Sequence, residues 1–108
     1  MPRGRKKEPS LELYEHIAAL ETPEECQRFF EDLCAVTELR AMEQRFDVAK
    51  KLHAGMVYTA ILAQTGASSA TVSRVNRMLN YGTGALPALL DRVAAQRGET
   101  PEETEEEV

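Results

Sequence analysis

The chain has few cysteines and no long apolar run. Its only cysteines are Cys26 and Cys34. On one helix their separation would place them roughly 12 Å apart, too far for a disulfide within the chain. No apolar run reaches about 18 residues, and the first residues lack the apolar core of a signal peptide. We therefore expect a cytoplasmic protein with no membrane partner.

The chain also lacks the groups of residues that catalysis or metal binding needs. The two histidines, His16 and His53, have no cysteine or histidine neighbours at ligand spacing. There is no glycine-rich phosphate loop and no catalytic order of serine, histidine and aspartate. The acidic pairs Glu24-Glu25 and Glu31-Asp32 are typical of solvated helix faces. We expect a protein that is not an enzyme and that holds no cofactor and no metal.

No segment alternates polar and apolar residues for long enough to predict a β-strand. Apolar residues instead recur every three or four positions, which predicts an all-α fold of about six helices. A chain of 108 residues has room for one domain. Because a helical domain this small, without disulfide or metal, often completes its core by dimerising, we expect a homodimer.

The formal net charge of −5 is spread unevenly along the chain. Residues 1–7 contain four basic residues and residues 99–108 contain six glutamates, whereas residues 8–98 form a mildly acidic body. Like-charged runs stay solvated. We therefore expect a disordered basic arm over residues 1–9, a helical domain over 10–98 and a disordered acidic tail over 99–108. The arm can follow DNA phosphates or can simply be a solubilising end.

Two helices are expected before residue 37. The first begins after Pro9-Ser10 and has a buried stripe made of Leu13, Ile17 and Leu20. The second begins at Pro23, where Thr22 can cap the free amides and Glu25 can complete a capping box. It is expected to end near Val36.

A third helix opens at Thr37-Glu38 and runs to about residue 53. Its stripe fits either a core within one chain or a contact across a dimer axis, and consists of Leu39, Met42, Phe46, Ala49 and His53. A last helix follows Gly82-Thr83-Gly84 and ends before Gly98. Its apolar face is suited to core or dimer packing, or to binding a partner, and consists of Leu86, Leu89, Leu90 and Val93.

Residues 57–79 have the pattern of a helix-turn-helix. A short helix over 57–65 is followed by Gly66-Ala67, and a second helix can be capped by Ser68 or Ser69 and continue to about Leu79. Gly66 stands where the tight turn needs a residue that tolerates positive φ. A plain helical hairpin has the same dimensions, so spacing alone does not separate the two interpretations.

The second helix of this pair has two chemically different faces. At 100° per residue its apolar side consists of Val72, Val75 and Leu79. The opposite side consists of Ala70, Ser73, Arg74 and Arg77. Arginine can bond guanine O6 and N7, and the free amides at a helix start attract phosphate. The two arginines are the only charged residues from 54 to 80, so DNA would not repel this surface.

The segment resembles the helix-turn-helix of the Trp repressor superfamily, and within it the YerC/YecD-like branch. The most specific part is the run Gly-Ala-x-x-Ala-Thr-Val-Ser-Arg at residues 66–74, and a looser similarity extends over about residues 20–95. Leu52, Met56, Ile61 and Leu79 also carry the resemblance. It implies an intertwined helical dimer that binds a roughly palindromic operator, with half-sites about 34 Å apart.

The resemblance also implies which residues contact DNA and whether tryptophan binds. The implied contacts are Ser68, Ser69, Ala70, Thr71, Ser73, Arg74 and Arg77. In the Trp repressor, tryptophan lies beside a glycine that follows the arginine and is held by arginines and threonines. Thr71 and Arg74 match that pattern, but Val75 replaces the glycine, and Gln44 and Cys34 replace an arginine and a threonine. We expect no tryptophan binding at this position, and the effector, if there is one, is unknown.

The leading hypothesis is thus a dimeric, sequence-specific transcriptional regulator whose partner is double-stranded DNA. The alternative from a different class is a helical adaptor that keeps the fold but binds protein. Affinity that falls steeply with salt would indicate DNA contacts through phosphates, whereas a mainly apolar protein contact would not weaken in this way.

Overall fold

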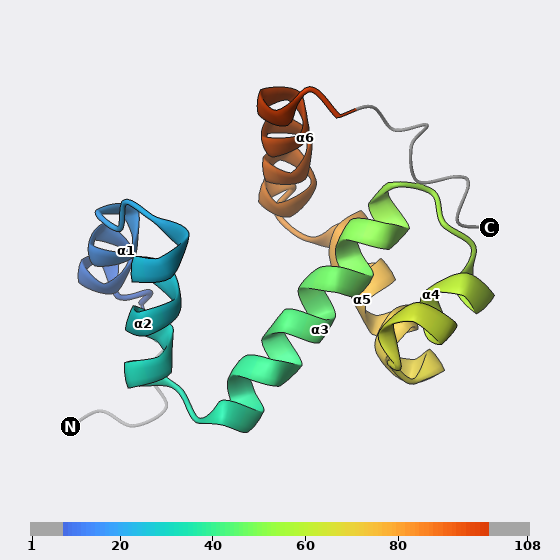
Figure 1. The fold of residues 1–108 in the computed structure, drawn as a ribbon, viewed down its shortest axis with the longest axis horizontal. Coiled ribbons are helices and arrows are strands. Elements are labelled where there is room, and N and C mark those ends of the chain that lie inside the picture. The colour runs from blue at the N-terminus through green and yellow to red at the C-terminus, as the bar shows by residue number, and fades with distance from the viewer. Residues whose placement is uncertain (1–7, 100–108) are drawn as a thin grey trace. The chain divides into compact units, whose positions relative to one another are not determined.

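The regular secondary structure in the described part of the chain is all helical. The computed structural model describes residues 8–99, and in that range it has six α-helices and no β-strand. They are α1 (Leu11–Ala18), α2 (Pro23–Leu33), α3 (Val36–His53), α4 (Tyr58–Thr65), α5 (Ser69–Tyr81) and α6 (Ala85–Arg97) (Figure 1). The expected all-α fold of about six helices is confirmed. None of these six helices is long and apolar enough to cross a membrane.

The chain forms two compact units, one up to Leu39 and one from Arg40 onward, with the boundary inside α3. The first unit holds α1, α2 and the first turn of α3. The second holds the rest of α3 and helices α4 to α6. Most of the basic arm expected over 1–9 and of the acidic tail expected over 99–108 lies outside the described residues.

The helix starts in the first unit follow from local capping. Ser10 Oγ accepts a hydrogen bond from the Leu13 N–H at 3.3 Å, and Thr22 Oγ1 accepts one from the Glu25 N–H at 3.0 Å. The Glu25 carboxylate in turn accepts from the Glu21 N–H at 2.9 Å. The expected capping box is therefore present, but the Glu25 carboxylate accepts from the N–H of Glu21 rather than from that of Thr22.

The junction between α2 and α3 differs from the expectation. α2 ends at Leu33 rather than near Val36, because Cys34 is extended, with φ −121° and ψ 151°. The Glu38 carboxylate accepts from the Ala35 N–H at 2.8 Å, which caps α3 and lets it begin at Val36 rather than at Thr37. Both cysteine thiols are free.

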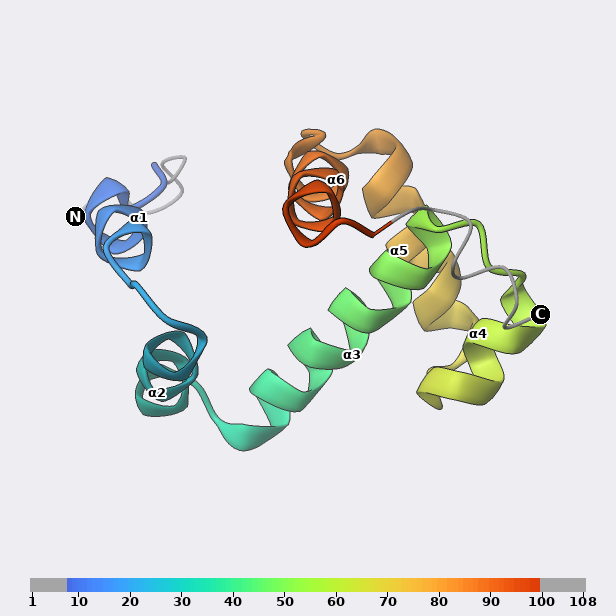
Figure 2. The ribbon, with the colours of Figure 1, turned by 45° about the horizontal axis from the view of Figure 1, so that its top comes forward.

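The core of the second unit is built from α3, α4 and α5. Its buried members are Val48, Ala49, Met56, Ile61, Ala67, Val72 and Val75. Each of the larger ones stabilises the fold by about 1.5–3 kcal/mol through burial. Leu86 of α6 packs against this cluster while partly exposed. Figures 1 and 2 both show α4 and α5 beside the C-terminal half of α3.

Only part of the expected α3 stripe is buried within the chain. Leu39 and Ala49 are buried, but Met42 and Phe46 are 41% and 48% exposed. Val48 faces the core instead, because α4 and α5 pack on that side of the helix. On α6, Leu89 is likewise 44% exposed rather than packed. His53 Nε2 lies 2.7 Å from Asp91 Oδ1, which joins the end of α3 to α6.

Candidate nucleic-acid interface

A three-residue turn, Gly66 to Ser68, connects α4 to α5. Gly66 has φ 72° and ψ 6°, the left-handed conformation that glycine adopts without strain, as the sequence predicts. The Thr65 hydroxyl donates to the Ile61 carbonyl at 2.7 Å and accepts from the Ala67 N–H at 3.1 Å. Hydrogen bonds to the end of α4 therefore fix the direction in which α5 leaves the turn.

Ser68 caps the start of α5. Its Oγ accepts from the Thr71 N–H at 3.1 Å and lies 3.1 Å from the Thr71 hydroxyl oxygen, to which it donates. Of the two serines that the sequence offers as a cap, the structure uses Ser68. The backbone amides of Ser69 and Ala70 precede the first hydrogen-bonded turn and point out of the helix start. An anion can bind there.

The two faces of α5 are arranged as the helical wheel predicts. Val72 and Val75 are 0% and 1% exposed, and Leu79 packs against the same cluster. Of the predicted contact residues, Thr71 is half-buried, and the exposed ones are Ser68, Ser69, Ala70, Ser73, Arg74 and Arg77. The structure thus brings all seven to the turn and the outer face of α5. Their contact with DNA stays a prediction.

The positive charge on α5 is not neutralised within residues 8–99. Neither Arg74 nor Arg77 has an ion pair or hydrogen bond there. No acidic residue occurs between Ala54 and Leu90. The two guanidinium groups are therefore available to an external anion, and no neighbouring carboxylate on α4 or α5 would oppose its approach.

The two units carry opposite net charge. The sequence predicted only a mildly acidic body over residues 8–98. Described residues 8–39 contain nine acidic residues and one arginine, a net charge of −8. Residues 40–99 contain eight basic and four acidic residues, a net charge of +4. The unit with the helix-turn-helix pattern is therefore the positive one.

Two residues that differ from those of the Trp repressor's tryptophan site have structural roles here. Val75 is buried in the core of the second unit. The Gln44 side-chain amide donates to the Thr65 carbonyl at 3.3 Å. Both side chains are thus committed to packing or to a hydrogen bond inside the unit.

The residues predicted from the sequence to contact DNA do not include the last turn of α5. The helix continues to Tyr81, two residues beyond the expected end at Leu79. Tyr81 is 83% exposed and Met78 is 48% exposed. The available signal was the spacing of Arg74, Arg77 and Tyr81, which places all three on one face.

Two short helices joined by a glycine turn, with a buried apolar seam and an exposed cationic face on the second helix, define a protein of the helix-turn-helix class. Residues 10–94 match the Trp repressor protein family. The chain belongs to this family, which is one of DNA-binding regulators rather than enzymes.

Similar proteins support this assignment and are bacterial. The uncharacterized protein YerC of Bacillus subtilis (strain 168) is 49% identical over 82 residues, which cover 76% of this chain and 79% of YerC. A Trp repressor candidate from Staphylococcus aureus has a crystal structure with a TM-score of 0.72 and 46% identity, covering 76% of this chain and 82% of that one. The crystal structure of a TrpR-like protein from Eubacterium eligens ATCC 27750 has a TM-score of 0.70 and 43% identity. The match covers 82% of this chain and 87% of that one.

Proposed function

We propose that this protein is a transcriptional regulator that binds specific double-stranded DNA sequences as a homodimer, through α4 and α5, and that it has no enzymatic activity. The observation that carries the proposal is the exposed face of α5. Arg74 and Arg77 lack protein partners there within residues 8–99, and the positive unit presents them. Membership of the Trp repressor family supports the same function.

The first two turns of α5 would read and anchor the DNA. Arg74 can form a bidentate pair with guanine O6 and N7 in the major groove. The amides of Ser69 and Ala70 can bind a phosphate, and the small side chain of Ala70 permits close approach. Thr71 and Ser73 offer hydroxyl groups for base or phosphate contacts, and Ser68 holds the start of the helix.

Dimerisation would cover apolar side chains that the single chain leaves exposed. Those of α1 to α3 are between 41% and 69% exposed and include Leu11, Tyr14, Leu33, Val36, Met42 and Phe46. Covering such residues with a second copy removes apolar area from water, at about 25 cal/mol per Å². Two helix-turn-helix units would then face half-sites about 34 Å apart.

We also propose that tryptophan is not the effector. The β-branched Val75 fills space beside Arg74 in the helix, and Gln44 supplies no positive charge to hold a carboxylate. The Thr65 carbonyl already takes up one donor of the Gln44 amide. The proposed regulator therefore binds its operator without this ligand.

Selection of bound sequences from a random duplex pool, at near-physiological salt, tests the function. The wild type should enrich a palindromic motif, and the Arg74→Ala, Arg77→Ala double variant should enrich none. An Arg45→Ala, Arg92→Ala double variant is the matched control, because it removes the same charge from exposed positions outside α4 and α5. If the folded wild type enriches nothing, the DNA-binding proposal fails and the helical adaptor becomes the better interpretation.

A further inference from the structure

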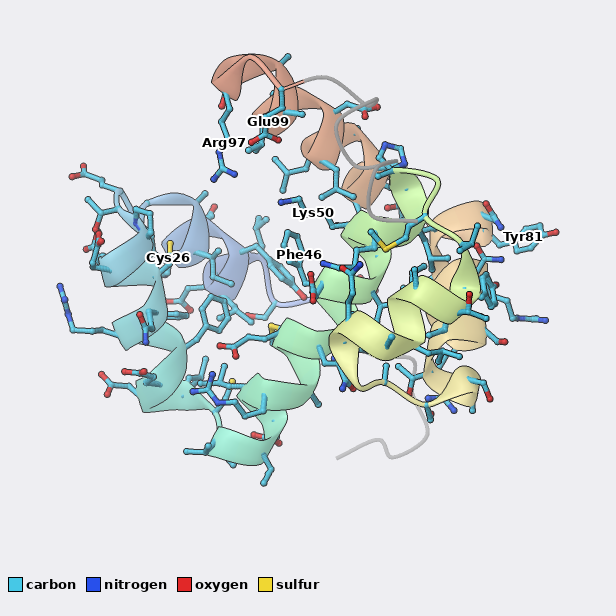
Figure 3. The ribbon with its side chains drawn as sticks, turned by 45° about the vertical axis from the view of Figure 1, so that its right-hand side comes forward. Cys26, Phe46, Lys50, Tyr81, Arg97 and Glu99 are labelled. Atoms are coloured by element: carbon cyan, nitrogen blue, oxygen red, sulfur yellow. The ribbon has the colours of Figure 1, made fainter. Side chains whose placement is uncertain are left out.

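The outer face of α5 carries an open hollow that extends from Arg74 to the end of the helix. It has a volume of about 410 Å³ and is lined by Arg74, Arg77, Met78, Tyr81 and Gly82. Figure 3 shows the Tyr81 side chain extending away from the helices at the end of α5. Within residues 8–99 its hydroxyl has no hydrogen-bond partner.

Arg77 and Tyr81 are four residues apart, so their side chains lie on one face with about 5–6 Å between the Cβ atoms. Two side chains that start this close can bring a guanidinium group and a phenol hydroxyl to two oxygens of one phosphate group. An anion is favoured over an apolar partner because no carboxylate lies on α4 or α5 and the unit is positive.

The length of α5 separates this pair from the base-reading end. From Ala70 to Tyr81 the helix rises about 16 Å, whereas the major groove is about 8.5 Å deep. When the first turn of α5 points into the groove, the last turn lies near the rim, where the DNA backbone runs. In that arrangement Tyr81 would lie closer to phosphates than to base edges.

We propose that Arg77 and Tyr81 together hold a DNA backbone phosphate at the rim of the groove, while Arg74 reads a base. This inference rests on the proposed function and assigns base reading and phosphate binding to different residues of α5. Phosphate contacts fix the position of a protein on the duplex without carrying sequence information. Arg77 and Tyr81 would therefore strengthen binding to every duplex, and Arg74 would set the preference for the operator.

The test compares affinity for the selected duplex and for a scrambled duplex of equal length, each at several salt concentrations. Tyr81→Phe removes only the hydroxyl and should weaken binding to both duplexes by a similar factor, roughly three- to tenfold, with the salt slope unchanged because no charge is lost. Arg77→Ala should weaken both and lower the salt slope by about one. Arg92→Ala on α6, at an exposed position outside α4 and α5, is the control for the loss of one positive charge and should bind as the wild type does.

Two results would overturn the inference while leaving the proposed function intact. One is a Tyr81→Phe variant that binds both duplexes as tightly as the wild type, in which case the hollow serves a small anion or a protein partner. The other is a Tyr81→Phe variant that loses affinity for the selected duplex alone, since that would make Tyr81 a base-reading residue. A folded wild type that binds neither duplex would instead overturn the proposed function, and this inference with it.

Discussion

The Gln44 side chain donates a hydrogen bond to the Thr65 carbonyl at 3.3 Å and so joins α3 to the last residue of α4. Thr65 is also the residue whose hydroxyl holds the turn into α5. One side chain on the central helix thus supports the helix-turn-helix at the point where its direction is set.

Replacing Gln44 with Met should lower the free energy of unfolding by about 1 kcal/mol, because the Thr65 carbonyl loses a donor in a partly buried position while side-chain length is kept. Urea denaturation at one fixed protein concentration measures the change. Arg45→Met, at the next and exposed position of α3, is the control and should unfold near the wild-type midpoint. Equal midpoints for Gln44→Met and wild type would mean that this bond adds no net stability.

Tryptophan should leave the thermal stability of the protein unchanged. A ligand that occupied a folded site would raise stability by about 2.7 kcal/mol at a hundredfold excess over its dissociation constant. The β-branched Val75 side chain is buried in the core, where a tryptophan site would have a glycine, so we expect no shift of Tm in millimolar L-tryptophan. A dose-dependent rise in Tm would contradict the proposal, and the same titration against Val75→Gly would show whether the valine alone excludes the ligand.

Local signals predicted the helix-turn-helix well. Gly66 marks a left-handed turn, Ser68 is one of two candidate caps, and the spacing of Val72 and Val75 identifies the buried side of α5. Each signal acts over a few residues, so it can be interpreted without knowing how the chain packs. Pro23 and Thr22 marked the start of α2 for the same reason.

Features that depend on distant packing were not predicted. The Gln44 bond joins residues 21 positions apart. Met42 and Phe46 occur at core-like spacing, yet they are exposed because α4 and α5 pack against Val48 on another side of α3. The same spacing serves a core within the chain and a contact with a second copy, so the pattern left both interpretations open.

Replacing Phe46 with Glu should weaken the proposed dimer. The 48% exposed ring would contribute apolar area to the contact, and a buried carboxylate without a partner costs several kcal/mol. Analytical ultracentrifugation over a range of concentrations should show a higher dissociation constant for the variant. Gln96→Glu on α6, which adds the same charge at an exposed position, should stay as dimeric as the wild type. An unchanged dimer in Phe46→Glu would place the contact elsewhere.

Replacing Arg74 with Ala should reduce specific DNA binding by about 1–3 kcal/mol, the usual contribution of one bidentate arginine to guanine pair. The loss should be concentrated on the selected duplex, because a scrambled duplex offers no matched guanine at that position. Arg74→Lys keeps the positive charge but loses the planar guanidinium group. Compared with Arg74→Ala, it should therefore recover more of the wild-type affinity for the scrambled duplex than for the selected one. Arg92→Ala on α6 controls for the loss of one positive charge. If Arg74→Ala weakened both duplexes equally, Arg74 would be a phosphate contact, and sequence reading would have to come from the start of α5 alone.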